Sequence, residues 1–116
     1  EQRRLLDTAL TIFERCVARL RPGVKASAIH ATATAVAAEA GFELPFLLGH
    51  GIGCQNWEPP LLGDADETEL AAGMVITLEP GLYVPELGGV RLENTFLITQ
   101  TGAESLTVGP MNLWEL

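Results

Sequence analysis

Apolar residues in the first forty positions recur in steps of three and four, the spacing of one face of an α-helix. The first stripe covers residues 5–20 and stops at the Arg-Pro-Gly sequence 21–23. A second, alanine-rich stripe predicts a helix that starts at about residue 25 or 27 and runs to residue 40, with Gly41 as its C-terminal cap. Both helices are expected to pack on one face of the strands that follow. The side chains expected to make this contact are Leu6, Ile12, Phe13, Val17, Ile29 and Val36.

Beyond residue 41, glycine and proline become frequent, and short runs of β-branched and aromatic residues replace the helical period. The polar segment 64–72 has room for one helical turn. Two helices followed by a series of strands is the order of an α+β domain with a mostly antiparallel sheet. The predicted strands are 46–50, 53–58, 74–79, 82–84, 90–99 and 105–108.

Two predicted strands each carry a glutamate on their more polar face, Glu79 and Glu93. The turn-forming sequence 85–89 lies midway between them, so a hairpin about this turn places the two carboxylates roughly opposite each other. Residues 80–81 are expected to add a bulge, which leaves the register open. Facing carboxylates repel, so either Arg91 or a metal ion must compensate them. The alternative is that both glutamates are solvated on an open face of the sheet.

His50 follows an apolar run and lies between glycines in the sequence Gly-His-Gly-Ile-Gly at 49–53. Glycines on both sides are expected to leave the imidazole ring accessible. One imidazole and two carboxylates suit a divalent metal such as Mn²⁺, Co²⁺, Fe²⁺ or Zn²⁺, although the spacing matches no short metal motif. The other interpretation is a surface histidine at a strand end. His30 lacks such glycines and is interpreted as an exposed helix residue.

Composition narrows the class of protein. The chain has 116 residues, enough for one domain, and a net charge of −8, which disfavours binding to the phosphate backbone of nucleic acids. No apolar run approaches the roughly 18 residues of a membrane span, so no membrane partner is expected. Cys16 and Cys54 form no Cys-X-X-Cys motif and are interpreted as reduced thiols of a cytoplasmic protein.

Several blocks, in this order along the chain, resemble the pita-bread metallopeptidases, a family that includes Xaa-Pro aminopeptidases, prolidases, methionine aminopeptidases and creatinase. The Xaa-Pro aminopeptidase branch is the most similar. The resemblance implies two helices packed on a curved, mostly antiparallel sheet. It also implies that 1–116 is a single, partial domain, the C-terminal half of a catalytic domain whose upstream half is absent. The matching blocks are GHGIG at 49–53, EPP at 58–60, GMVITLEPGLYV at 73–84 and GGVRLENTFLIT at 88–99.

The resemblance implies a site for two divalent metal ions, Mn, Co, Zn or Fe, with five protein ligands. His50, Glu79 and Glu93 match three of these ligands, and Glu93 matches the one that bridges both metals. The other two are aspartates of the absent upstream half, so this chain alone is expected to bind metal incompletely and to be inactive. In the whole enzyme, a hydrolase, a metal-activated water would attack a peptide or amide carbonyl. His50 and Glu79 are the expected catalytic residues, with Glu79 also accepting a proton from that water.

Trp57 departs from the family pattern, which has a histidine before the glutamate of the EPP block. Indole cannot accept a proton or carry charge, so three functions stay open. They are an Xaa-Pro aminopeptidase-like hydrolase, a creatinase-like hydrolase of a small non-peptide metabolite, and a catalytically degenerate binding domain. Trp57 and Arg91 are expected on the substrate side, although Trp57 can also be a packing residue. Asn94, where the family usually has aspartate, is a smaller departure. The expected partner is a peptide or small amide, and a homodimer is left open.

Overall fold

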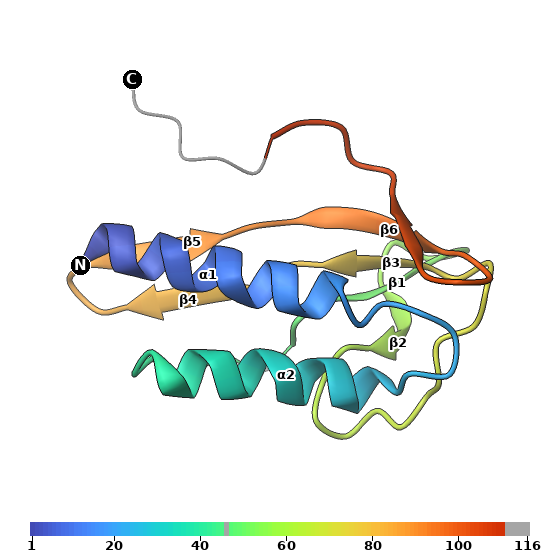
Figure 1. The fold of residues 1–116 in the computed structure, drawn as a ribbon, viewed down its shortest axis with the longest axis horizontal. Helices are drawn as coiled ribbons and strands as arrows, with labels where there is room; N and C mark the ends of the chain where they lie inside the picture. The colour runs from blue at the N-terminus through green and yellow to red at the C-terminus, as the bar shows by residue number, and fades with distance from the viewer. Residues whose placement is uncertain (46, 111–116) are drawn as a thin grey trace.

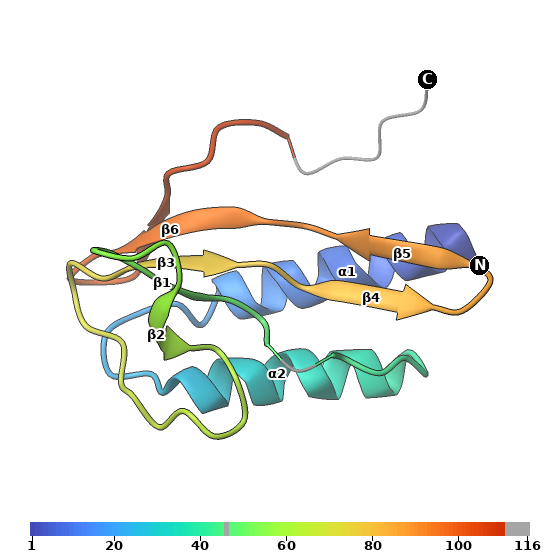
Figure 2. The same ribbon diagram turned by 180° about the vertical axis from the view of Figure 1, so that it is seen from behind.

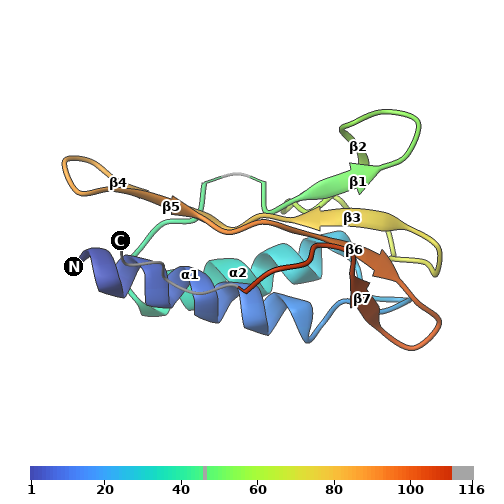
Figure 3. The ribbon, with the colours of Figure 1, turned by 90° about the horizontal axis from the view of Figure 1, so that it is seen from above.

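The computed structural model describes residues 1–45 and 47–110, so Phe46, in the first predicted strand, lies outside the described residues. Two helices precede a series of short strands, and both helices lie on the same side of those strands (Figures 1 and 3). The predicted α+β class is therefore confirmed. The elements are α1 (Gln2–Val17), α2 (Ala26–Glu39), β1 (His50–Ile52), β2 (Glu58–Leu61), β3 (Val75–Leu78), β4 (Gly81–Val84), β5 (Gly88–Arg91), β6 (Asn94–Ile98) and β7 (Ala103–Ser105).

Five strands form an antiparallel sheet in the order β2-β1-β3-β6-β7, and β4 and β5 form a separate two-stranded ribbon. In space, β4 extends β3 and β5 leads into β6, so the four strands make one long hairpin (Figure 2). Leu78 pairs with Asn94 before the interruption, and Gly81 pairs with Arg91 after it. Residues 79–80 separate β3 from β4, and residues 92–93 separate β5 from β6. Because both arms of the hairpin have two residues here, the register continues without a shift. The bulge predicted at residues 80–81 is wrong.

Pro80 is the physical reason that the hydrogen-bonded ladder is interrupted between the β3–β6 pair and the β4–β5 pair. The Leu92 N–H donates to the Pro80 carbonyl over 3.1 Å, but proline has no N–H to return the second hydrogen bond of this pair. The strand predicted over 90–99 is therefore divided into β5 and β6. Glu79 and Glu93 are the next facing positions. The Glu79 N–H donates to Leu48 instead (2.7 Å), so the two glutamates occupy a non-hydrogen-bonded pair, the kind in which facing backbones lie closest.

The predicted helix stripes face the strands. Ile12 and Ile29 are fully buried, and the Phe13 ring contacts that of Phe96 in β6 with centroids 6.0 Å apart. Val17, Val36 and other partly buried side chains pack against this core, whereas Leu6 is half-buried. Figure 3 shows both helices beneath the strands, which curve over them. The helices thus cover one face of the sheet and leave the opposite face for the site.

The contact between α1 and α2 is close because the residues between them are small. Ala33 and Ala37 of α2 are fully buried, and the Cys16 thiol donates to the Ile29 carbonyl over 3.7 Å. Burial raises the pKa of the Cys16 thiol to about 12, so it stays a protonated, unreactive group. Cys54 is exposed, and both cysteines are free, as predicted.

Segment 64–72 forms no helical turn and instead passes across the start of α2. The first N–H groups of a helix have no partner within it. Here the Ala26 N–H donates to the Thr68 carbonyl (2.9 Å) and the Ser27 N–H to the Asp66 carbonyl (2.8 Å). The Asp66 carboxylate accepts from the backbone N–H groups of Leu61 (2.6 Å) and Thr68 (2.8 Å). Asp66 therefore joins β2 to the segment that caps α2.

Hydrogen bonds from Thr68, and from the Leu61 backbone, lower the pKa of Asp66 below its ordinary value. A carboxyl whose folded pKa is lowered stabilises the fold above its unfolded pKa, and this contribution is lost as the pH falls through the folded value. We expect Asp66→Ala to lower the free energy of unfolding at pH 7 by about 1–2 kcal/mol, with a difference that shrinks below about pH 4. Urea unfolding of the full-length protein between pH 7 and pH 3 measures this, with the exposed Asp64→Ala as control. Equal stability of Asp66→Ala and wild type at pH 7 would contradict the assignment.

Candidate active site

His50 and Glu79 form the centre of the site. His50 begins β1 and Glu79 directly follows β3, the strand beside it. The His50 Nε2 lies 3.1 Å from the Glu79 Oε1, and only 12% and 16% of the two side chains are exposed. The other ring nitrogen of His50, Nδ1, lies 2.9 Å from the Gly51 carbonyl oxygen. Both ring nitrogens therefore have oxygen neighbours, and the ring orientation is set from both ends.

Thr77 connects these two residues from within β3. Its hydroxyl accepts the His50 backbone N–H over 3.0 Å and donates to the Glu79 Oε1 over 3.0 Å. Only 3% of Thr77 is exposed, so this polar group is buried on the same face of the strand as Glu79. Sequence reasoning did not select Thr77. The sequence pattern that indicates it is its position two residues before Glu79 on a predicted strand, which places both side chains on the same face.

The glycines around His50 serve close strand packing as well as access. A Cβ at Gly49 would lie 2.1 Å from the Thr77 carbonyl oxygen, and one at Gly51 would lie 2.5 Å from the Pro59 carbonyl oxygen. Any larger residue at either position would push β1 away from its neighbours. The glycine pattern thus places His50 against β3, which is what brings its ring to Glu79.

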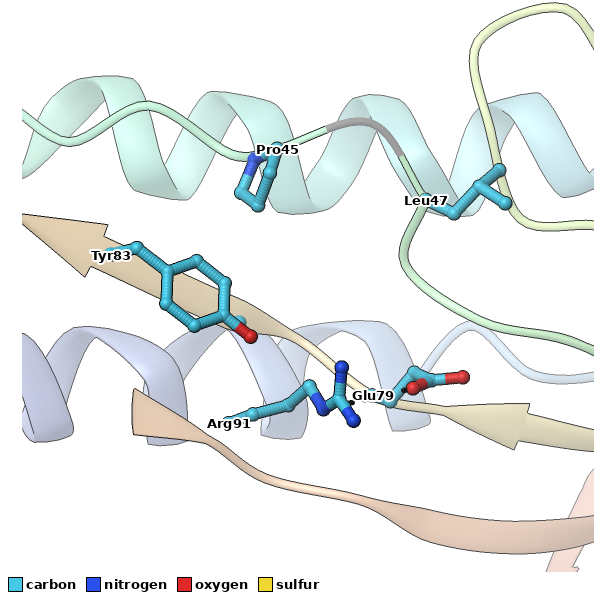
Figure 4. A pocket seen from close by; sticks show the side chains of 6 residues that line it. Pro45, Leu47, Glu79, Tyr83 and Arg91 are labelled. Carbon is cyan, nitrogen blue, oxygen red and sulfur yellow. Dashed lines mark ion pairs between the residues drawn. The ribbon is translucent and has the colours of Figure 1, made fainter. Parts of the chain in front are cut away.

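Arg91 and a cleft lie on the side of Glu79 away from β1. The Arg91 Nε lies 3.8 Å from the Glu79 Oε2, and 55% of the Arg91 side chain is exposed, so this ion pair is weak. Figure 4 shows the Tyr83 ring, the Arg91 guanidinium and the Glu79 carboxylate along one side of a cleft, across from Pro45 and Leu47. The cleft has a volume of about 380 Å³ and is lined by Pro45, Leu47, Glu79, Gly81, Tyr83 and Arg91.

Tyr83 was also not selected from the sequence. It pairs across the ribbon with Gly89, and a Cβ at Gly89 would lie 2.4 Å from the Tyr83 Cδ1. The ring therefore lies flat over this glycine, with 55% of the residue exposed, and forms a wall of the cleft. The aromatic residue at a strand position opposite a glycine was the available signal.

Trp57 lies on the other side of the pair. Its ring centroid is 5.8 Å from that of His50, with an angle of 51° between the rings, and 52% of Trp57 is exposed. The strand predicted over 53–58 is instead a loop, and β2 begins only at Glu58. The Glu58 carboxylate accepts the Gln55 N–H over 3.0 Å, which closes this loop. Because about half of Trp57 is exposed, the alternative that it is a buried aromatic residue is wrong.

Glu93 is placed opposite Glu79 by the hairpin register, but its side chain is exposed. Across residues 1–45 and 47–110, no three His, Cys, Asp or Glu side chains are grouped closely enough to hold a metal ion. The structure thus brings together His50 and Glu79, but not all three expected ligands. Arg91 is paired with Glu79, and facing carboxylates with no cation between them repel.

The chemistry of the His50–Glu79 pair fits a metal site. Histidines that bind metals usually donate one ring N–H to a carbonyl or carboxylate, which directs the other nitrogen to the metal. The contact of the His50 Nδ1 with the Gly51 carbonyl has this form, and it directs Nε2 toward the Glu79 carboxylate. His50 and Glu79 are therefore suited to hold one divalent ion between them, with Thr77 orienting both.

Comparison with known proteins agrees with this fold. The sequence profile of metallopeptidase family M24 matches residues 1–100. The chain is 43% identical over 109 residues to an Xaa-Pro dipeptidase of Pyrococcus furiosus, which covers 92% of this chain and 31% of that protein. It is also 43% identical over 107 residues to the agropine synthesis cyclase of Rhizobium rhizogenes, covering 90% of this chain and 27% of that protein.

Solved structures give the same result. The prolidase of P. furiosus superposes with a TM-score of 0.90 at 41% identity, over 94% of this chain and 33% of that chain. The methionine aminopeptidase of Rickettsia prowazekii shares the fold alone, with a TM-score of 0.79 at 21% identity over 92% of this chain and 52% of that chain. The fold is thus that of the pita-bread metallopeptidases. The chain belongs to metallopeptidase family M24 and spans about a third of the length of the Xaa-Pro dipeptidase that it matches.

Among the described residues, neither helix is long and apolar enough to cross a membrane.

Thr77→Val tests the connection between His50 and Glu79. Valine has nearly the same shape but removes the hydroxyl, so it leaves the His50 N–H without its acceptor and the Glu79 carboxylate without a donor. We expect the free energy of unfolding of the full-length protein to fall by about 1–3 kcal/mol, measured by urea titration. Thr77→Ser keeps the hydroxyl and is expected to lose less than half as much. A larger loss in Thr77→Ser than in Thr77→Val would show that the methyl group, rather than the hydroxyl, matters at this position.

Proposed function

We propose that this chain supplies part of the active site of a metal-dependent hydrolase that cleaves amide bonds, of the Xaa-Pro dipeptidase and aminopeptidase type. The observation that carries the proposal is the contact of His50 with Glu79 on adjacent strands, in a chain that belongs to family M24. The chain spans only about a third of the dipeptidases that it resembles. We therefore also propose that 1–116 is a partial catalytic domain, inactive alone, and that the remaining ligands come from elsewhere in the whole protein.

His50, Glu79 and Glu93 are the proposed ligands of two divalent ions, Mn, Co, Zn or Fe. Such ions, when bound, lower the pKa of water and polarise a carbonyl group. Glu79 is the proposed proton acceptor, because its carboxylate already accepts a hydrogen bond from Thr77 and lies at the end of a cleft. The backbone position of Glu93 opposite Glu79 supports its role as a third ligand, since a cation between two facing carboxylates would offset their repulsion.

The substrate is proposed to enter from the face of the sheet opposite the helices, where Trp57 and Arg91 lie on either side of the His50–Glu79 pair. The cleft beside Arg91 accommodates part of a dipeptide or a small amide. The exposed cation of Arg91 suits a carboxylate or a polarised carbonyl of such a ligand. Free Cys16 and Cys54 favour a reducing, cytoplasmic location. A homodimer is compatible with this arrangement.

Hydrolysis of a small non-peptide metabolite is the second candidate function. Trp57 supports it, because indole beside His50 offers no proton to a peptide leaving group. A 43% identical relative is an agropine synthesis cyclase, a name that describes no peptidase. A binding domain without catalysis is less well supported, since His50 and Glu79 are both present and in contact.

Metal dependence is the first test of the proposal. We expect the full-length protein to hydrolyse Xaa-Pro dipeptides or small amides, to lose this activity in EDTA, and to regain it with Mn²⁺, Co²⁺, Zn²⁺ or Fe²⁺. Glu79→Gln keeps the shape of the side chain but removes its charge and its basicity, so kcat/KM should fall at least about a hundredfold. Steady-state kinetics with metal analysis of each variant make the measurement. Full activity in a protein shown to be metal-free would refute the proposal.

The role of Glu93 as a ligand is tested by Glu93→Gln. An amide is a much weaker ligand than a carboxylate, so the variant should bind fewer ions per chain and lose at least about tenfold in metal affinity. Glu104→Gln, on the edge strand β7, removes the same charge from an exposed position and is the matched control. Metal titration by calorimetry on the full-length protein compares the two. Equal metal affinity in both variants would place Glu93 outside the metal site.

A further inference from the structure

Trp57 leaves about half of its surface in solvent, with 52% exposed, and its ring lies 5.8 Å from that of His50. Within the described residues, the hydrophobic core and the partly buried side chains packed on it do not include Trp57. Core packing therefore does not explain this residue. Its place beside a candidate catalytic group fits a binding site, because such sites are lined mainly by apolar and aromatic side chains.

Glu58 anchors the chain next to Trp57. Glu58, the next residue, starts β2 and pairs with Gly51 of β1. Gly51 permits this pairing because a Cβ there would lie 2.5 Å from a backbone oxygen of β2. The Glu58 carboxylate closes the preceding loop through the Gln55 N–H, over 3.0 Å. The half-exposed indole can thus serve as a contact surface beside His50.

The two sides of the His50–Glu79 pair differ in chemistry. Beyond Glu79 lie Arg91 and the cleft, whose lining does not include Trp57 (Figure 4). Beside His50 lies the indole, which presents a flat apolar face and a single N–H donor. A ligand that spans the pair therefore meets a cation on one side and an apolar wall on the other.

We propose that Trp57 is a substrate-binding residue that selects a bulky apolar group next to the scissile amide. This inference rests on the proposed amide hydrolase function and adds the class of substrate. The group is either a pyrrolidine ring or a branched or aromatic side chain, both of which stack on the face of an indole. A substrate with hydrogen in place of this group loses the contact.

The test uses the full-length, metal-loaded protein and the peptides Leu-Pro, Gly-Pro and Leu-Gly, which change one apolar group at a time. Trp57→Ala should lower kcat/KM for Leu-Pro about tenfold more than for the peptide that lacks the contacting group, chiefly through KM. If the smaller effect is seen with Gly-Pro, the contacting group is the leucine side chain. If it is seen with Leu-Gly, the contacting group is the pyrrolidine ring. Trp57→Phe keeps an aromatic face and should stay within about threefold of wild type. An equal change for all three peptides in a folded Trp57→Ala variant overturns the inference.

Failure of the proposed function has a different signature. If the wild-type protein cleaves none of the peptides, binding of leucine amide and glycine amide is measured by calorimetry instead. Trp57→Ala should then weaken the binding of leucine amide about tenfold relative to glycine amide. Equal weakening of both amides, or no binding of either to the wild-type protein, overturns the role of Trp57.

Discussion

The unbroken register of the long hairpin is the constraint on which the site depends. The pairing of β3 with β6 continues through residues 79–80 and 92–93 into the pairing of β4 with β5. Pro80 removes one hydrogen bond from this ladder without adding a residue, so the backbone loosens locally while the register is kept. Glu79 and Glu93 lie at this point. The candidate site thus coincides with the place where the sheet gives up part of its hydrogen bonding.

A second constraint comes from β1, which carries His50 to this point. Gly49 and Gly51 let β1 lie against the backbone on both sides, at distances that any side chain would prevent. The Thr77 hydroxyl then bonds to the His50 backbone and to the Glu79 carboxylate. The geometry of the pair therefore depends on two glycines and one buried hydroxyl as much as on the imidazole and the carboxylate.

Charge and apolar surface are divided around the pair. Arg91 partly neutralises Glu79 on the side of the cleft, while Trp57 contacts His50 on the other side. Helices α1 and α2 cover the opposite face of the strands and contribute no side chain to the cleft. The helical layer packs the hydrophobic core, and the uncovered face carries the candidate site. Such a division is expected when one face of an antiparallel sheet packs on the core and the other meets solvent.

The sequence alone determined the helices and their buried faces and placed Glu79 and Glu93 roughly opposite each other, because these follow from periodicity and from a turn placed midway between two strands. It also marked His50, Arg91 and Trp57 through local blocks of residues. Only the tertiary structure decided that the register passes Pro80 without a bulge and that Thr77 and Tyr83 belong to the site. It alone decided that Trp57 is exposed beside His50 and that the side chain of Glu93 does not join those of His50 and Glu79. These outcomes depend on contacts between strands distant in the chain, on buried hydroxyl partners and on repulsion between facing carboxylates, none of which a one-dimensional pattern contains.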